Sequence, residues 1–172
     1  ELGSGWSTFL PGGVEDDMEV LAETIARIKQ RAAANGRDPG SLQFFAMVFI
    51  VLAETDEAAW KLARHPVPAW MAIAAASITS AETWKKWGYE HPLGEFAWPK
   101  DASVTTVGGD LARELADKVP DVVTDHSFVW GSPERVAKRC KAYIDAGITH
   151  LSFWNYGACA DPASDKHFLP LM

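Results

Sequence analysis

The chain has 172 residues, of which 48% are hydrophobic and 23% charged, and its formal net charge is −7. This length is enough for one domain with a buried core, and the composition is ordinary for a globular protein. The negative charge argues against nucleic acid or an anionic membrane as the main partner. The densest basic group, Lys138, Arg139 and Lys141, is typical of a solvated helix face.

The cysteines and apolar runs suggest neither a disulfide framework nor a membrane segment. Cys140 and Cys159 have no metal-ligand spacing and form no disulfide pattern. The longest uncharged run, residues 66–81, is shorter than the roughly 18–20 residues that a spanning helix needs. We therefore expect no membrane span and no bound metal, and we expect a cytoplasmic protein because no secretory signal is recognised.

The first half of the chain alternates strand and helix signals. Residues 5–10 (GWSTFL) are aromatic and β-branched and predict a strand that ends at the turn formers PGG. Over residues 14–35 the apolar positions step by three and four, which predicts a helix closed by Gly36. The nine apolar residues at 44–52 favour a strand buried on both faces, as in a parallel sheet.

The middle of the chain begins with helices and then becomes irregular. Thr55 is placed to cap a helix that opens with Asp56 and Glu57, and a second helical stretch is predicted at about 68–87. Residues 88–126 are rich in turn formers and aromatic side chains, with one short helix expected around 110–118. Irregular excursions of this kind on a rigid scaffold often carry function.

A strand–helix–strand unit closes the sequence. A short extended run, HSFVW, precedes a helix that Ser132 is placed to cap. Gly147 ends this helix, and residues 149–155 predict the returning strand. The expected buried stripe of the helix is Val136, Cys140, Tyr143 and Ile144.

Repeated strand–helix–strand units imply right-handed crossovers and a parallel sheet, so the predicted fold class is α/β. Three strands are too few to close a (β/α)8 barrel, which needs about 250 residues. The unit is therefore either an open sheet or the last third of a barrel.

No single motif identifies an enzyme class, because the sequence has no P-loop, GxGxxG, HExxH or GxSxG. The candidates are polar residues that follow strands, where parallel α/β folds bind ligands. Ser7 and Thr8, near the end of the first strand, are placed to hydrogen-bond a ligand, and Trp6 is either core or pocket wall. The alternative for this segment is a plain strand-to-helix turn.

Glu90 and His91 are adjacent and flanked by Gly88 and Gly94, which suggests an acid–base pair on a loop. Adjacent side chains in an extended chain point in opposite directions, so we do not expect both to act on one atom. A surface loop without a catalytic role is the alternative.

The last strand ends in Asn155 and Tyr156, at the carboxyl end where barrel sites lie. Its alternation places His150, Ser152 and Trp154 on one face and Leu151, Phe153 and Asn155 on the other. We expect Trp154 to belong to the core. The eight tryptophans of the chain also suit an apolar wall for a planar or lipid-like ligand.

Several motifs, taken in order, resemble the C-terminal part of the luciferase-like flavin and deazaflavin oxidoreductases. They are SGWSTFLPGG, GRDPGSLQF, VLAETDEAAWKLAR and WGSPERVAKRCKAYIDAGITHLSF. The stretches WGYEHPLGE and WNYG are similar to the coenzyme F420-dependent branch, near the phthiodiolone and hydroxymycolate-type ketoreductases and methylenetetrahydromethanopterin reductase. One departure is Ser4, where the family usually has aspartate before glycine and tryptophan.

The resemblance implies that residues 1–172 form one partial luciferase-like TIM (β/α)8 barrel, seen as its C-terminal segment with about three parallel strands and their helices. The irregular excursion falls at about 88–126. The implied activity is F420-dependent hydride transfer between a deazaflavin and an organic substrate, and the alternative is an FMN-dependent monooxygenase of the same superfamily. In either case the protein orients the ring against the substrate.

In this family most residues that hold the ring or act as acid or base lie in the other half of the barrel, so the segment alone is expected to be inactive. The resemblance implies no catalytic residue here, but it implies substrate or cofactor-phosphate contacts by a set of seven residues: Trp6, Ser7, Thr8, Glu90, His91, Asn155 and Tyr156. We further expect a small-molecule or lipid-like substrate and a homo-oligomer for the full-length protein.

A different class of function is a non-catalytic half-barrel that binds a partner chain supplying the first five strands. Exposed parallel edges at residues 5–10 and 149–155 would need such a partner or would lead to aggregation. The intact mass of the natively expressed protein separates the two hypotheses. A half-barrel has the 18.8 kDa of these residues, whereas the oxidoreductase is expected to have about twice that mass.

Overall fold

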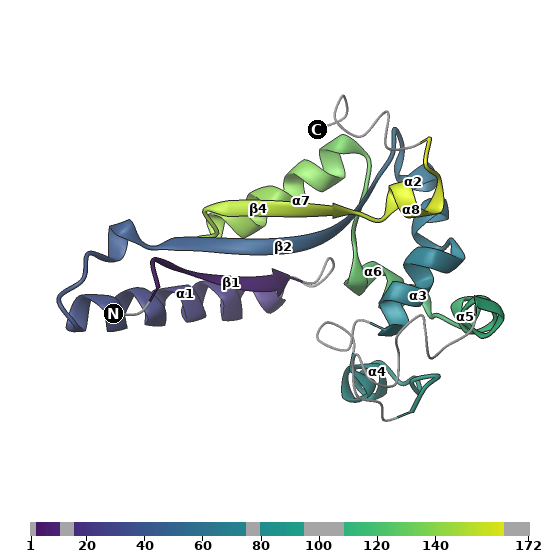
Figure 1. Cartoon of the computed structure of the whole chain (residues 1–172), viewed down its shortest axis with the longest axis horizontal. Helices are drawn as coiled ribbons and strands as arrows, with labels where there is room; N and C mark the ends of the chain where they lie inside the picture. The colour runs from purple at the N-terminus through teal and green to yellow at the C-terminus, as the bar shows by residue number, and fades with distance from the viewer. Residues whose placement is uncertain (1–2, 11–15, 75–79, 95–108, 164–172) are drawn as a thin grey trace.

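The structure is a computed structural model that describes residues 3–10, 16–74, 80–94 and 109–163. Three strands run side by side: β1 (Gly5–Leu10), β2 (Gln43–Leu52) and β4 (His150–Asn155) (Figure 1). Both β1 and β4 pair with β2, and a short strand, β3 (Val129–Gly131), pairs with the last residues of β2. Every pairing is parallel, which confirms the predicted α/β class and parallel sheet.

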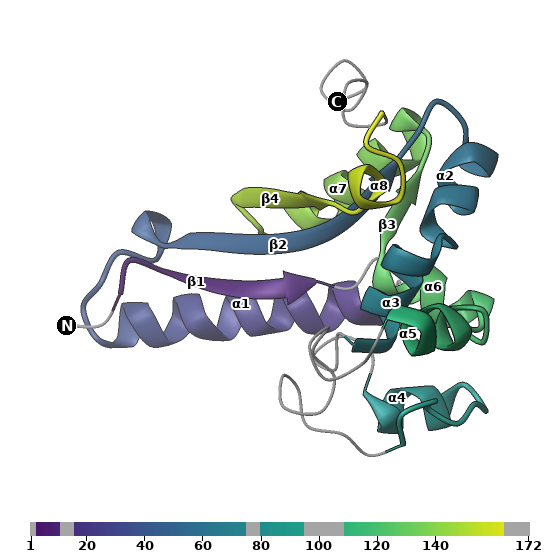
Figure 2. The same ribbon diagram turned by 45° about the vertical axis from the view of Figure 1, so that its right-hand side comes forward.

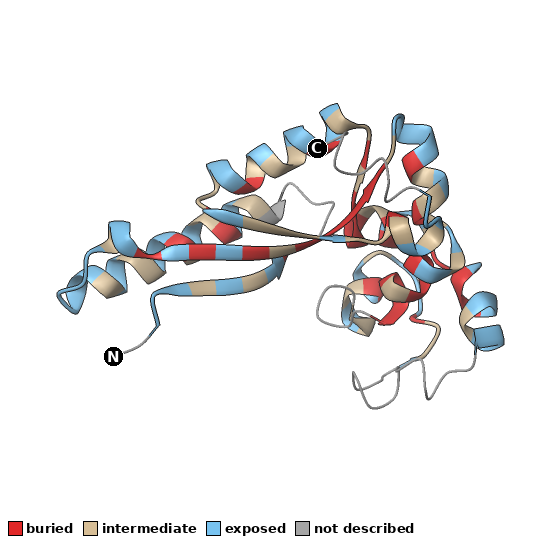
Figure 3. Ribbon diagram, turned by 45° about the horizontal axis from the view of Figure 1, so that its top comes forward, coloured by how far each residue is buried: buried red, intermediate tan, exposed pale blue. Residues whose placement is uncertain are grey.

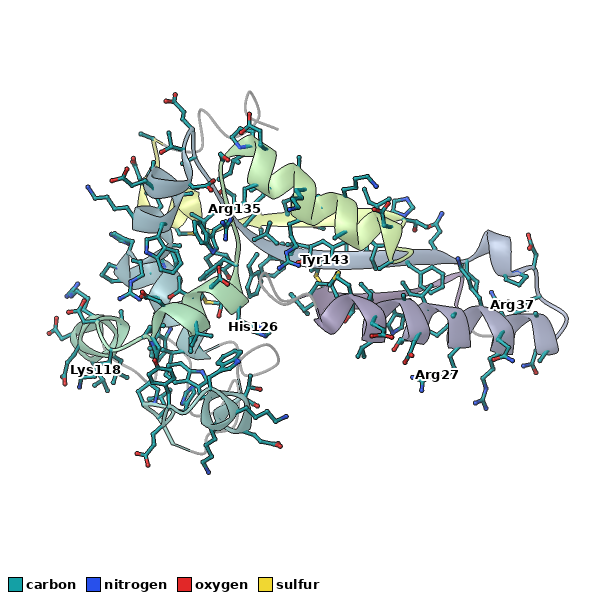
Figure 4. The ribbon with its side chains drawn as sticks, turned by 180° about the vertical axis from the view of Figure 1, so that it is seen from behind. Arg27, Arg37, Lys118, His126, Arg135 and Tyr143 are labelled. Atoms are coloured by element: carbon teal, nitrogen blue, oxygen red, sulfur yellow. The ribbon has the colours of Figure 1, made fainter. Side chains whose placement is uncertain are left out.

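One face of the sheet, which we call the helix face, is covered by α1 (Asp16–Ala34) and α7 (Pro133–Asp145). The register aligns Trp6 with Phe44 and Leu10 with Val48, so alternate residues of the strands share this face. Buried side chains from both helices pack on these residues to form the first core; they include Leu21, Ile25, Val136 and Tyr143. Tyr143 lies between α7 and the strands (Figure 4).

The opposite face, which we call the open face, carries Ser7 and Phe9 of β1, Phe45, Met47 and Phe49 of β2, and His150, Ser152 and Trp154 of β4. Phe45 is 37% exposed, so the prediction that residues 44–52 are buried on both faces is wrong for the first half of β2 (Figure 3). Within the described residues, α1 and α7 both pack on the helix face, and Phe9, Phe45 and Trp154 of the open face are exposed to solvent. Trp154, expected in the core, is 45% exposed for the same reason.

The predicted helix at 14–35 is confirmed as α1 over the described residues, while residues 11–15 lie outside them. Gly36 closes the helix with a φ of +73°, in the left-handed region that glycine adopts without steric cost. A single 3₁₀ turn, η1 (Pro39–Ser41), then leads into β2, and Asp38 caps it by accepting from the backbone N–H of Gly40 at 2.9 Å.

Helices gather beyond the carboxyl ends of the strands, among them the short α8 (Gly157–Ala160) (Figure 2). The others are α2 (Asp56–Ala63), α3 (Pro66–Ala74), α4 (Ala81–Lys86), α5 (Gly109–Ala116) and α6 (Asp121–Ser127). Their apolar side chains form a second core with Phe49 and Val51 of β2. None of the described helices is both long and apolar enough to cross a bilayer.

The helices in the middle of the chain differ from those predicted from the sequence. The helix predicted at 68–87 is two helices, α3 and α4, and residues 75–79 between them lie outside the described part. The excursion at 88–126, expected to hold one short helix, contains both α5 and α6 in its described residues, while 95–108 fall outside them. The sequence did not predict α6 because valine and threonine favour strands, whereas burial of Val123 and Thr124 in the second core supports a helix.

The predicted helix after Ser132 is confirmed as α7, but two of its details are wrong. Ser132 occupies the N-cap position without a capping hydrogen bond from its side chain. Ile144, expected in the buried stripe, is 57% exposed. It borders a groove of about 420 Å³ between α7 and β4, which it lines together with Cys140, Leu151 and Phe153.

Candidate functional site

A cluster of aromatic rings occupies the open face at the carboxyl ends of the strands. Phe49 of β2 lies at its centre, with ring centroids 5.8 Å from Phe9, 5.8 Å from Trp154 and 4.9 Å from Tyr156. Phe9 and Trp154 also meet edge to face at 5.9 Å. Phe49 is 5% exposed, whereas Phe9 is 37% and Trp154 45% exposed. We call Phe9, Phe49, Trp154 and Tyr156 the aromatic wall.

The three candidates on β1 divide between the two faces of the sheet. Ser7 is exposed on the open face, aligned with Phe45. Trp6 and Thr8 lie on the helix face, where Trp6 packs against the first core with its ring centroid 6.4 Å from that of Phe44. Of this set, Ser7 alone shares a face with the aromatic wall.

Glu90 and His91 lie in different environments. Glu90 is exposed, while His91 is buried against the ring of Trp84 at 4.7 Å. The Nδ1 atom of His91 accepts from the backbone N–H of Leu93 at 3.2 Å, so Nε2 carries the proton and donates to the carbonyl of Ile73 at 3.0 Å. Burial lowers the pKa of His91, and the hydrogen bond to Ile73 opposes that shift.

Asn155 is the last residue of β4 and Tyr156 directly follows it, as the sequence indicated. The side-chain oxygen of Asn155 accepts from the N–H of Ala158 at 3.4 Å, at the start of α8 (Gly157–Ala160). Tyr156 packs against Phe49 and against Phe128, whose ring centroid is 5.8 Å away. Burial raises the pKa of the Tyr156 hydroxyl, and Cys159 raises it further, so the hydroxyl stays protonated at neutral pH.

The N-terminus of α7 is occupied by a carboxylate of the protein itself. The N–H of Ser132 donates to Asp56 at 2.7 Å, and hydrogen bonds from Ser132 lower the pKa of that carboxyl. Arg135 lies 3.8 Å from Asp56 and 3.5 Å from Asp125, and its guanidinium sits 3.9 Å from the Trp130 ring centroid. A helix N-terminus is a ready anion site, but here Asp56 takes that place.

The sequence identified the end of β4, but it did not identify Phe9, Phe49 or Trp154 as site residues, and Trp154 was expected in the core. Each was read only as part of an apolar strand, because periodicity within one strand does not show which residues of neighbouring strands meet. The strand register could have revealed the cluster, since it aligns Phe49 with Trp154 and places Phe9 beside Met47 on the same face. Neither the register nor the missing cover on the open face follows from periodicity.

Parallel strands with helices packed on one face are the arrangement found in part of a (β/α)8 barrel. The family model for luciferase-like monooxygenases matches residues 5–150, and the chain belongs to this family. The resemblance seen in the sequence motifs is therefore confirmed at the level of the family. The comparison with curated proteins gave no match.

Solved structures of the same fold are much longer than this chain. The coenzyme F420-dependent tetrahydromethanopterin reductase from Methanopyrus kandleri aligns with a TM-score of 0.59 and 11% identity, over 100% of this chain and 46% of its own. An F420-dependent secondary alcohol dehydrogenase aligns with a TM-score of 0.50 and 14% identity, over 90% of this chain and 38% of its own.

A long-chain alkane monooxygenase aligns with a TM-score of 0.51 and 21% identity, over 96% of this chain and 35% of its own. The chain thus spans less than half the length of each of these structures. At these identities the three likenesses establish the fold, which is part of a TIM barrel.

Proposed function

We propose that the protein carrying this chain is a coenzyme F420-dependent oxidoreductase that transfers a hydride between the deazaflavin and a small organic substrate. The observation that carries the proposal is an aromatic wall at the carboxyl ends of three parallel strands, in a member of the luciferase-like family. Ligands of (β/α)8 barrels bind at these ends. The similarity of WGYEHPLGE and WNYG to the F420-dependent branch favours the deazaflavin over FMN.

The residues of the open face fit the ring portion of a flavin-type cofactor. Such a ring needs a flat apolar surface and a few hydrogen-bonding groups at its polar edge. Phe9 and Trp154 offer exposed ring surface, and the hydroxyls of Ser7 and Tyr156 offer the polar contacts. No lysine or arginine lies on the open face of β1, β2 and β4, so an anionic cofactor tail would be held elsewhere.

The bound deazaflavin would supply the hydride carrier, and the residues of this chain would position and shield the ligands. The aromatic wall would exclude water from one side of the site. Tyr156, whose pKa is raised, would present a protonated hydroxyl as a hydrogen-bond donor. The hydrogen bond of His91 to Ile73 would fix the loop after α4 to α3, and Glu90 of this loop would stay exposed and able to contact a ligand.

Equilibrium titration of the natively expressed, cofactor-free protein with F420 and with FMN tests the proposal. We expect micromolar binding of F420 and binding of FMN that is weaker by about tenfold or more, a difference of about 1.4 kcal/mol. Tighter binding of FMN would assign the protein to the flavin monooxygenases of the same family. Binding of neither cofactor would reject the oxidoreductase and favour the non-catalytic half-barrel.

A further inference from the structure

We propose that His91 is a pH-sensitive anchor that holds residues 88–94, the loop after α4, on α3 and releases this loop when the imidazole is protonated. We call these residues the α4 loop. The proposal goes beyond the proposed function and does not depend on the identity of the cofactor. It assigns a role to a buried histidine that the proposed hydride transfer does not use as an acid or a base.

The first argument is that one imidazole joins α3, α4 and the α4 loop. Its Nε2 donates to the carbonyl of Ile73 on α3 at 3.0 Å, and its ring packs on that of Trp84 on α4 at a centroid distance of 4.7 Å. Its Nδ1 accepts from the N–H of Leu93 at 3.2 Å, within a turn in which the N–H of Gly94 donates to the carbonyl of His91 at 2.8 Å. The position of the α4 loop therefore depends on the state of this ring.

The second argument is that the hydrogen bond at Nδ1 requires a neutral ring. A neutral imidazole has one donor and one acceptor nitrogen, whereas both nitrogens of an imidazolium are donors. A proton on Nδ1 would face the N–H of Leu93, so two donors would point at each other and the hydrogen bond would be lost. Protonation therefore breaks the contact that ties the imidazole to the turn.

The third argument is that the site opposes a charged ring. His91 is 6% exposed, and burial lowers the pKa of His91 below its ordinary value of 6.5. The hydrogen bond to Ile73 opposes this shift of the pKa because it favours the imidazolium, but burial has the larger effect. The imidazolium gains more from water than it loses at Ile73, so protonation favours a conformation in which the ring has left its site.

The described charged groups nearby lie in water or in ion pairs of their own. α3 carries no titratable residue. The titratable side chains of α4 and the α4 loop other than His91 are exposed: Glu82, Lys85, Lys86, Tyr89 and Glu90. The carboxylates of α5 and α6 each pair with a cation: Asp110 with Arg113, Glu114 with Lys118, Asp121 with Arg64 and Asp125 with Arg135. His126 of α6 packs on the ring of Trp87 at 4.8 Å.

His65 is an exposed counterpart of His91 in the same chain. Both histidines precede a proline, and the Nδ1 of His65 accepts from the N–H of Val67 at 3.4 Å, two residues further on, as in His91 and Leu93. Because His65 is exposed, water hydrates its imidazolium and protonation costs one surface hydrogen bond. His65 therefore separates the effect of burial from the effect of the local hydrogen bond.

Hydrogen–deuterium exchange of the natively expressed protein between about pH 5 and pH 7.5 tests the anchor. Peptides that contain the α4 loop are compared at each pH with peptides from α7, so that the intrinsic effect of pH on exchange cancels in the ratio of the two rates. We expect a constant ratio above about pH 6.5. Below this pH the ratio should rise by up to about tenfold for each pH unit, down to the pKa of the buried ring.

His91→Asn is the matched variant, because its side-chain oxygen can accept from the N–H of Leu93 as Nδ1 does but cannot be protonated. It should make the ratio independent of pH, whereas His65→Asn should keep the pH dependence of the unmodified protein. If His91→Asn does not fold, His91→Gln takes its place, since its side-chain nitrogen can donate to Ile73.

The inference is overturned if the ratio in the unmodified protein does not change with pH, because the α4 loop would then open only together with α7. It is also overturned if the folded His91 variant keeps the pH dependence, or if His65→Asn removes it. Since this readout needs no cofactor, failure of the anchor leaves the F420 titration unaffected. A protein that does not bind F420 can still show the pH-dependent release of the α4 loop.

Discussion

Gly131 is a residue whose backbone conformation excludes a side chain. Its φ is +138°, and a Cβ built there would collide with the side chain of Arg135. We expect Gly131→Ala to lower the free energy of unfolding by about 1–3 kcal/mol, because the strain adds to the displacement of Arg135 from Trp130 and Asp56. Chemical denaturation measures this loss. Gly109→Ala is the control, since a Cβ there meets nothing within 4 Å, and equal effects of the two variants would refute the strain.

His91 couples stability to pH because its pKa is lowered below the ordinary value of 6.5 by burial. The unfolded chain binds a proton more readily than the folded one, so stability is complete above about pH 6.5 and falls as the pH drops toward the folded pKa. The slope for one group is at most about 1.4 kcal/mol per pH unit. Denaturation midpoints between about pH 5 and pH 8 measure it.

The matched variants for this prediction are His91→Gln and His65→Gln. His91→Gln should remove part of the pH dependence, whereas His65→Gln should keep it, because His65 is exposed. An unchanged slope in His91→Gln would show that His91 does not couple stability to pH.

That His91 would be buried while its neighbour Glu90 is exposed could be predicted only in part. Alternation indicates that the two point apart, but the sequence does not show that Ile73 and Trp84 enclose the imidazole.

Among the secondary-structure elements, α2 depends on a cap that the sequence predicted correctly. The hydroxyl oxygen of Thr55 accepts from the N–H of Ala58 at 3.1 Å, and Asp56 and Glu57 follow in the first turn. We expect Thr55→Ala to lower the free energy of unfolding by about 1 kcal/mol, and Thr55→Ser, which keeps the oxygen, to change it by less than about half of that. Thermal denaturation of both variants checks the cap. A serine variant as unstable as the alanine variant would contradict it.

Elements set by local patterns could be predicted, and elements set by distant packing could not. The period of the apolar residues in α1, the apolar run of β2 and Gly36 are signals contained within one segment. The helix α6 and the exposure of Ile144 depend on what lies over a segment, which its own residues do not encode. The same limit applies to the candidate site. The ends of the strands were identified, but the division of Trp6 and Ser7 between two faces required the register.

At the scale of the whole molecule, the open face governs how the 172 residues behave when they are produced alone. Within the described residues, β1 and β4 each pair with β2 on one side only, and the rings beside them are exposed. We expect this polypeptide to self-associate and to bind a fluorescent apolar dye, because paired edges and covered rings are what keep such sheets monomeric. We also expect it to show no oxidoreductase turnover. A dye-silent monomer by analytical ultracentrifugation would contradict the exposure of the open face.

The central claim, a hydride transfer that uses a deazaflavin, is tested most directly by turnover of the natively expressed protein without oxygen. Reduced or oxidised F420 is mixed with candidate carbonyl compounds or alcohols under anaerobic conditions, and the deazaflavin absorbance and the product are followed together. The account predicts one equivalent of product for each equivalent of F420 oxidised or reduced, in the absence of FMN. A product that forms only with reduced FMN and dioxygen would contradict it and identify a monooxygenase instead.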